Sequence, residues 1–332
     1  MMKTAAQFLR HPASRLLLLL WAALVLAAPA QAQSAYPDKP VRIIVAYAPG
    51  GVADLLARAL GVELGKALGQ GVIVENKVGA GGLIGTNACK DAAPDGYTLC
   101  IASTSSITLA PMLIKAAHYD GLKNFTPISL LANFPGVLSV SPKLGVKTTD
   151  DFLRWAKAHP GAGFGSSGIG TVFYFMALNI NFEHGTKLEP INYKGGSQAV
   201  ADVVAGNLPM VVDALTASLP FIKSGALVPI MQSGASRSAV LPDVPTAAET
   251  LLPRFKADSF QGVFGPAGLP PDVTAKLSAA IQRVGANPEF RKRIADMGGV
   301  AVIGTPQEFA AELRESSVLF QQMVRQSGMK PE

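Results

Sequence analysis

The chain has 332 residues, of which 49% are hydrophobic, and a formal net charge of +6. The first 32 positions hold three basic and no acidic residues, so 29 − 3 leaves 26 basic against 23 acidic residues and a charge of +3 for the remainder. So mild a charge argues against nucleic acid as a partner, and the length suits two domains of roughly 100–200 residues.

The N-terminus has the three-part pattern of a secretory signal peptide. Basic residues precede the apolar run Leu16–Ala28, and Ala30-Gln31-Ala32 is a small-residue cleavage motif. The run is short for a membrane span. We therefore expect residues 1–32 to be a Sec-type signal, removed after Ala32, and the mature protein to work outside the cytoplasm.

Strands and helices alternate in the first part of the mature chain. β-branched runs predict strands at Val41–Ala46, Gly71–Glu75 and Tyr97–Ala102. One predicted helix starts at Val52, after the first strand, and another ends near Asp91, before the third. This order is typical of an α/β fold with a parallel sheet covered by helices. Two extended segments, Phe125–Ala132 and Gly136–Val140, then lead into another region.

The second region repeats the same alternation. Its predicted strands are Gly163–Ser166, Glu189–Tyr193, Pro209–Asp213 and Val228–Gln232, and its predicted helices are Phe152–His159, Val172–Asn181, Gln198–Ala205 and Leu219–Ser224. From about Ala235 the chain returns, with a strand at Ser259–Phe264 and a block of helices at Pro270–Val284, Pro288–Met297 and Pro306–Ser327. Two such regions indicate a clamp that closes around a small molecule.

The turn at Pro49-Gly50-Gly51 connects the first strand to the first helix. Glycines leave the backbone N–H groups there uncovered, and the helix start directs its positive dipole end at the same place. The turn therefore suits an anion such as a carboxylate, although a plain strand–helix turn has the same pattern. Asp54 in the first helical turn is more simply a residue that orders this turn than a catalytic acid.

Two further turns are rich in hydroxyl and N–H groups: Ser103–Ser106 and Ser166–Thr171. Ser103–Ser106 closes a strand at its carboxyl end, where open α/β sheets bind ligands. Both turns lack lysine and arginine, which favours a carboxylate over a phosphate ester, although helix N-termini accept either anion.

Catalytic and cofactor motifs do not fit this chain. The stretch from Gly79 to Gly85 breaks the dinucleotide spacing at Ile84, and Gly163–Gly168 satisfies it without the long preceding strand or the following acid. The GxSxG motif of a serine hydrolase does not fit, because Ile169 stands where its last glycine is required. No histidine lies in a Gly/Ser turn to serve as the base. Clustered metal ligands are also missing from the sequence. We expect a binding protein without a cofactor or a bound metal rather than a secreted α/β enzyme of the hydrolase type.

The two cysteines, Cys89 and Cys100, allow one disulfide in an oxidising compartment. Cys89 falls late in a predicted helix and Cys100 in the next strand, so the separation of their Cα atoms decides the pairing. We expect two buried free cysteines, with the disulfide as the alternative.

Six stretches in this order resemble the Bug family, the periplasmic solute-binding proteins of tripartite tricarboxylate transporters. They are YPDKPVRIIVAYAPGGVADLLAR, ENKVGAGGLIGTNA, APDGYTL, SSGIGT, INYKGGSQAVADVVAGNLPMVVD and LPDVPTAAE, and together they span the mature chain. The resemblance implies a periplasmic binding protein type II fold. Its two α/β domains would be residues 33–135 plus 236–332, and residues 136–235, with the ligand cleft between them.

The resemblance also implies a ligand and its contacts. The family binds small carboxylates through backbone amides, hydroxyls and bridging waters, and it delivers them to large and small integral-membrane transporter subunits. The residues that match the family's binding positions in the first domain are Tyr47, Ala48, Gly50, Gly51, Asp54, Ser103, Ser105 and Ser106. Those in the second domain are Ser166, Ser167, Gly168, Gly170, Thr171 and Asp213. A monomeric periplasmic receptor is expected, which feeds either a transporter or a sensor kinase.

The chain departs from the family pattern at several positions. The changed residues are Ala110, Val172-Phe173-Tyr174, Val212 and Phe260. These changes predict a more apolar second-domain side of the pocket and favour a monocarboxylate with an apolar or aromatic body. The alternative is that Phe173 and Tyr174 face the core side of their helix and carry no information about the ligand.

Overall fold

The structure is a computed structural model that describes residues 36–79, 82–168, 170–193, 195–255 and 257–327. The chain divides into a short unit, Met1–Asp38, and a large unit, Lys39–Glu332. The predicted signal peptide at 1–32 lies outside the described residues. Of the helices that are described, none combines the length and the apolar character that a membrane crossing requires.

The first sheet of the large unit has six strands in the order β11-β4-β10-β3-β1-β2. They are β1 (Val41–Val45), β2 (Val72–Asn76), β3 (Thr98–Ser103), β4 (Phe125–Phe134), β10 (Ser259–Pro266) and β11 (Val300–Ala301). The expected parallel pairing holds for β1 with β2 and β3. It fails further along, because β10 returns from the second region and pairs antiparallel with both β3 and β4. The sheet is therefore mixed.

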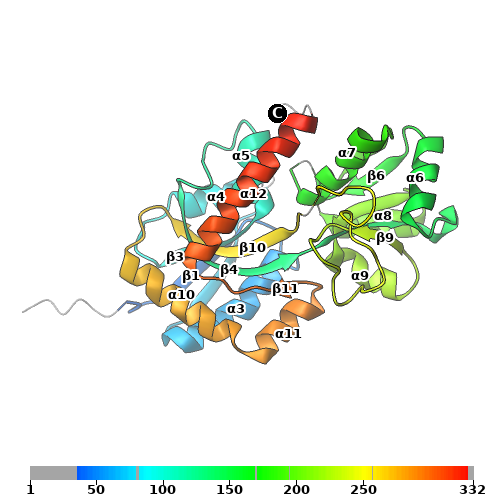
Figure 1. Cartoon of the computed structure of the whole chain (residues 1–332). Coiled ribbons are helices and arrows are strands. Elements are labelled where there is room, and N and C mark those ends of the chain that lie inside the picture. The colour runs from blue at the N-terminus through cyan, green and yellow to red at the C-terminus, as the bar shows by residue number, and fades with distance from the viewer. Residues whose placement is uncertain (1–35, 80–81, 169, 194, 256, 328–332) are drawn as a thin grey trace, which may run out of the picture. The chain divides into compact units, whose positions relative to one another are not determined.

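Helices cover both faces of this sheet (Figure 1). On one side lie α3 (Val52–Leu68), α10 (Pro271–Gly285) and α11 (Pro288–Asp296), and on the other α4 (Leu83–Lys90), α5 (Ala110–Leu113) and α12 (Pro306–Ser327). Successive residues of a strand project from opposite faces of the sheet. Thus Cys100, Phe260 and Phe264 share one core cluster with Phe309 of α12, which places their neighbours Ile101 and Gln261 on the α3 side.

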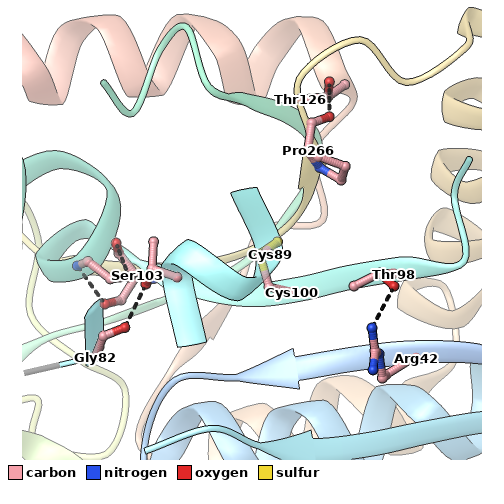
Figure 2. The surroundings of a disulfide bond; sticks show 10 residues. Arg42, Gly82, Cys89, Thr98, Cys100, Ser103, Thr126 and Pro266 are labelled. Carbon is pink, nitrogen blue, oxygen red and sulfur yellow. Dashed lines mark hydrogen bonds between the residues drawn. A yellow bond between two sulfur atoms is a disulfide. The ribbon is translucent and has the colours of Figure 1, made fainter. Parts of the chain in front are cut away.

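A disulfide joins Cys89 of α4 to Cys100 of β3 (Figure 2). The expectation of two free cysteines was wrong. The helix α4 packs directly on the sheet and brings the two Cα atoms to 6.0 Å, well within the range that a disulfide can bridge. The sequence separation of 11 residues could not reveal this approach.

The second sheet has five strands in the order β7-β6-β8-β5-β9. They are β5 (Gly136–Val140), β6 (Gly163–Ser166), β7 (Glu189–Asn192), β8 (Met210–Ala214) and β9 (Val228–Gln232). The associated helices are α6 (Thr149–Ala158), α7 (Val172–His184), α8 (Gly196–Ala205) and α9 (Leu215–Lys223). Its main core lies under α6 and α7 and includes Phe320 and Met323 of α12, so the C-terminal helix contributes to this core too.

Two backbone crossings join the sheets, one between β4 and β5 and one between β9 and β10. Ser233 links them, because its hydroxyl accepts the Gly136 N–H at 2.7 Å and its own N–H donates to the Gly136 carbonyl at 3.0 Å. The same hydroxyl donates to Asp258 Oδ1 at 3.2 Å. Burial raises the pKa of Asp258 to about 6, against the hydrogen bond from Ser233 and together with the charge of Glu312 on α12.

Most elements appear near their expected positions, with two differences. The stretch 103–106, expected as a turn, leads into η2, a π-helical turn at Ser105–Leu109 that continues into α5. The two-residue strand β11 was not expected, because so short a segment has no periodicity to detect.

Candidate functional site

The loop between β1 and α3 is held in shape by its own backbone and by Asp54. Gly50 adopts φ +84°, a left-handed conformation that glycine reaches without strain, and its N–H donates to Asp54 Oδ2 at 2.9 Å. Gly51 is the N-cap of α3 in an extended conformation, with φ −79° and ψ 168°. The glycines therefore do different work: Gly50 makes the reversal and Gly51 starts the helix.

Asp54 is buried, and every partner it has stabilises the loop. Arg58 donates to both carboxylate oxygens, and Asn76 donates to Oδ1 at 2.9 Å and to the Tyr47 carbonyl at 3.0 Å. Burial acts to raise the pKa of Asp54, but the hydrogen bonds from Arg58, the Gly50 N–H and Asn76 outweigh it and lower the pKa. An ionised carboxylate with all its partners in place orders the turn and is unsuited to proton transfer.

The first turn of α3 presents free backbone donors. The N–H groups of Val52 and Ala53 precede the first intrahelical hydrogen bond, which Leu55 N–H donates to Gly51 at 2.9 Å. No acceptor for either N–H occurs among the described residues, and Gly51 itself is exposed. The loop thus offers an anion two donors and the positive end of a 17-residue helix.

Tyr47 connects this loop to the end of β3. Burial raises the pKa of its hydroxyl, opposed by hydrogen bonds with Ser103 and Ser106. The N–H of Ser103 donates to Ser106 Oγ at 3.0 Å, and the Tyr119 hydroxyl donates to the Ser106 carbonyl. Ser103 lies at the far end of the strand that carries Cys100 (Figure 2). These contacts fix the hydroxyls at the end of the sheet.

The second group of predicted residues surrounds the turn between β6 and α7. Thr171 is the N-cap of α7, and its hydroxyl accepts the Tyr174 N–H at 3.2 Å. Ser166 Oγ accepts the Gly168 N–H at 3.3 Å. Gly168 and Gly170 adopt φ +113° and +89°, so glycine is needed at both positions of this turn.

Asp213 at the end of β8 is buried and accepts two backbone N–H groups, from Ser167 and from Ala214, each at 2.7 Å. Burial raises its pKa, and these hydrogen bonds oppose the rise. A Cβ on Gly196, at the start of α8, would lie 2.4 Å from Asp213 Oδ1. The carboxylate thus sits against the N-terminus of α8, where the helix dipole favours negative charge.

The predicted site residues form two groups, one on each sheet. The first contains Tyr47, Gly50, Gly51, Asp54, Ser103 and Ser106, with Ala48 exposed in the loop and Ser105 at the start of η2; the second contains Ser166, Ser167, Gly168, Thr171 and Asp213. Within the described residues no hydrogen bond joins the groups. Gly170 lies beside an element of the first region, since a Cβ there would lie 3.5 Å from Leu113 of α5.

Two hollows border the elements that carry the first group. One of about 470 Å³ lies between α3 and the edge strand β2, and one of about 290 Å³ lies between η2 and α12. The second shares Tyr119 with the Ser106 network.

The positions that depart from the family pattern are core positions. Ala110, Val212 and Phe260 are 4%, 0% and 2% exposed. Phe173 and Tyr174 lie in the core of the second sheet, and Phe173 packs over Gly136, whose Cβ would lie 2.2 Å from its ring. The alternative therefore holds: these residues face the core, and the argument for an apolar or aromatic ligand loses its basis.

The described residues contain no group of three or more His, Cys, Asp or Glu side chains that could hold a metal ion. The prediction missed Asn76 and Arg58, which hold Asp54, and Tyr119, which holds Ser106. Asn76 directly follows the second predicted strand, so its place at the carboxyl edge of the sheet was a usable signal.

Comparisons with known proteins agree on one family. The profile described as "Tripartite tricarboxylate transporter family receptor" matches residues 56–329. BugT of Bordetella pertussis is 32% identical over 307 residues, which cover 92% of this chain and 94% of BugT. A solved structure described as a periplasmic transporter is 37% identical, with a TM-score of 0.83 over 89% of this chain and 99% of the other. MatC from Rhodopseudomonas palustris, solved with bound malate, is 29% identical, with a TM-score of 0.79 over 87% of this chain and all of MatC.

Proposed function

The chain belongs to the tripartite tricarboxylate transporter receptor family, the Bug solute-binding proteins, and from this premise we propose that it captures a small carboxylate between its two α/β regions. The observation that carries the proposal is the loop between β1 and α3. There, the free N–H groups of Val52 and Ala53 lie at the positive end of α3, while Asp54 is already hydrogen-bonded to Gly50 and Asn76. The malate bound to MatC and the tricarboxylate transporters that the family is named for support the same class of ligand.

The rest of the proposal follows from the family. We propose export to the periplasm through the signal at residues 1–32, action as a monomer, and delivery of the ligand to the membrane subunits of a tripartite transporter. We also propose that domain 1 is residues 33–135 plus 236–332 and domain 2 is residues 136–235. The separate six- and five-stranded sheets support this division. The protein would bind its ligand without transforming it.

A thermal-shift screen of the purified mature protein tests the ligand class. Mono-, di- and tricarboxylates are compared with phosphate esters. A ligand at 100 times its dissociation constant stabilises the folded state by about 2.7 kcal/mol, which is readily seen as a raised melting temperature. Stabilisation by phosphate esters and by no carboxylate would refute the proposal.

A charge placed at Gly51 tests the location. A Cβ at this position would lie 3.6 Å from the Ala48 carbonyl, an ordinary contact, and the backbone is already extended. Gly51→Asp should therefore fold, while its carboxylate takes the free N–H groups and repels an anion, so carboxylate binding should be lost. Gly51→Ala is the matched neutral control and should retain most of the affinity. If both variants bind the carboxylate with equal affinity, the binding site does not include this loop.

A further inference from the structure

Gln261 on β10 carries a buried side-chain oxygen, Oε1, that has no hydrogen-bond partner among the described residues. The residue is 7% exposed. Most buried polar side-chain atoms in folded proteins are paired, so an unpaired one calls for an explanation such as a ligand or a bound water. An amide kept unpaired costs stability, about 1–3 kcal/mol.

The strand register places this amide beside the candidate site. Gln261 pairs directly with Ser103 in the antiparallel ladder of β10 and β3. Directly opposed residues of an antiparallel pair project from the same face, with Cβ atoms about 5 Å apart. Ser103 is the residue whose hydroxyl meets Tyr47, so Gln261 extends the row of polar groups from Tyr47 through Ser103 to a third strand.

The neighbours of Gln261 point the other way. Phe260 lies in the core against Phe309 of α12, at a ring-centroid distance of 5.5 Å, and Gly262 leaves room for the same ring. Strand alternation therefore directs the Gln261 side chain away from Phe309 and towards the face of the sheet on which α3 lies (Figure 1). It also follows Asp258 at the crossing between the sheets by three residues.

We propose that Gln261 is a ligand-binding residue of this site and that it recognises a hydrogen-bond donor, a hydroxyl or an ammonium group, next to the ligand's carboxylate. This inference rests on the proposed function. An acceptor oxygen cannot pair with a carboxylate, which has no proton to give, so its partner is a donor on the ligand. A site built to pair a polar group rejects the analogue that lacks it.

The test uses matched ligands and calorimetry on the mature protein. Malate, aspartate and succinate carry a hydroxyl, an ammonium or no donor on the same four-carbon diacid, and mandelate and phenylacetate form a second pair with an aromatic body. Wild-type protein should bind a donor-bearing acid about tenfold or more tightly than its donor-free analogue. Gln261→Leu should abolish that preference and leave the melting temperature of the unliganded protein equal or higher, because an unpaired amide is removed.

Ser139→Ala is the matched control, since the Ser139 hydroxyl is likewise a buried polar group without a partner in the part of the chain that the structure describes, but it lies on β5 of the second sheet. It should leave the preference unchanged. An unchanged preference in Gln261→Leu, equal loss of all ligands, or a lower melting temperature with unchanged binding would overturn the inference. So would a wild-type protein that binds neither set or does not discriminate within it. The proposed function fails only if the whole carboxylate screen is empty.

Discussion

Asp258 at the crossing between the sheets is expected to make the stability of this protein depend on pH. Its pKa rises from 3.8 to about 6 on folding, because burial and the nearby Glu312 disfavour the charge more than the Ser233 hydroxyl favours it. An acid with this difference between the unfolded and folded pKa destabilises the fold by about 3 kcal/mol once it is ionised. Since the residue is partly exposed, we expect about 2 kcal/mol.

The sign follows from proton uptake. Between pH 4 and 6 the folded protein holds a proton on Asp258 that the unfolded chain has released, so the free energy of unfolding falls as the pH rises through this window. Above pH 6 the full penalty is present. Asp258→Asn keeps an acceptor for Ser233 and removes the charge. It should be more stable than wild type by about 2 kcal/mol at pH 7.5 and equal to it at pH 4.

Urea denaturation of both proteins at several values between pH 4 and 7.5 measures this difference. Comparing the two proteins cancels Asp213, whose pKa burial also raises, while Glu312 is coupled to Asp258 and contributes to the measured difference. Stability curves that run parallel across the whole range would refute the reasoning, because they would show that Asp258 titrates equally in the folded and unfolded states.

Three further substitutions test the loop, the disulfide and the crossing. Asp54→Asn removes charge-assisted hydrogen bonds from a buried acid, so ligand affinity should fall about tenfold and stability by about 2 kcal/mol near neutral pH. Because the pKa of Asp54 is lowered, the difference in stability fades only when the pH falls below the usual range of an aspartate. Calorimetry showing undiminished affinity would contradict this role. Replacing Cys89 and Cys100 together by alanine opens a loop with a separation of 11 residues and should cost about 3 kcal/mol in urea denaturation, with reduced wild-type protein behaving alike. Gly136→Ala drives a methyl group into the Phe173 ring and should cost about 1–3 kcal/mol, much of which a second change, Phe173→Leu, should restore; an additive double mutant would exclude the clash.

The order of elements could be predicted because turn residues mark their ends. Pro49-Gly50-Gly51 and the Gly/Ser turn at 166–171 begin helices α3 and α7 near the expected residues. The antiparallel insertion of β10 could not be predicted, because a strand's own sequence carries no information about its direction relative to its neighbours. The Cys89–Cys100 pairing was missed for a related reason, since helix–sheet packing rather than sequence separation sets their Cα distance.

The candidate site was predicted in part, because glycine and serine turns are visible in a sequence while their partners are not. The roles of Asn76 and Tyr119 depend on contacts over 13 to 29 residues of chain, and that of Arg58 on a contact with Asp54 four residues earlier. Comparison with the family pattern drew attention to Phe173 and Phe260, which the structure places in cores. Gln261, next to Phe260, faces the opposite side of the strand, and its position does not follow from the changed residue.

The acids near the candidate site pair with backbone donors of the same turns. Asp54 and Asp213 lie near the starts of α3 and α8. Asp54 accepts the Gly50 N–H together with Arg58 and Asn76, and Asp213 accepts the N–H groups of Ser167 and Ala214. The protein's own carboxylates therefore satisfy many of the donors that these turns provide. The free N–H groups of α3 remain for one more carboxylate, and a backbone donor pair does not distinguish one carboxylate from another. Discrimination must come from side chains that contact the rest of the ligand, and Gln261 has a side-chain oxygen that no donor among the described residues reaches.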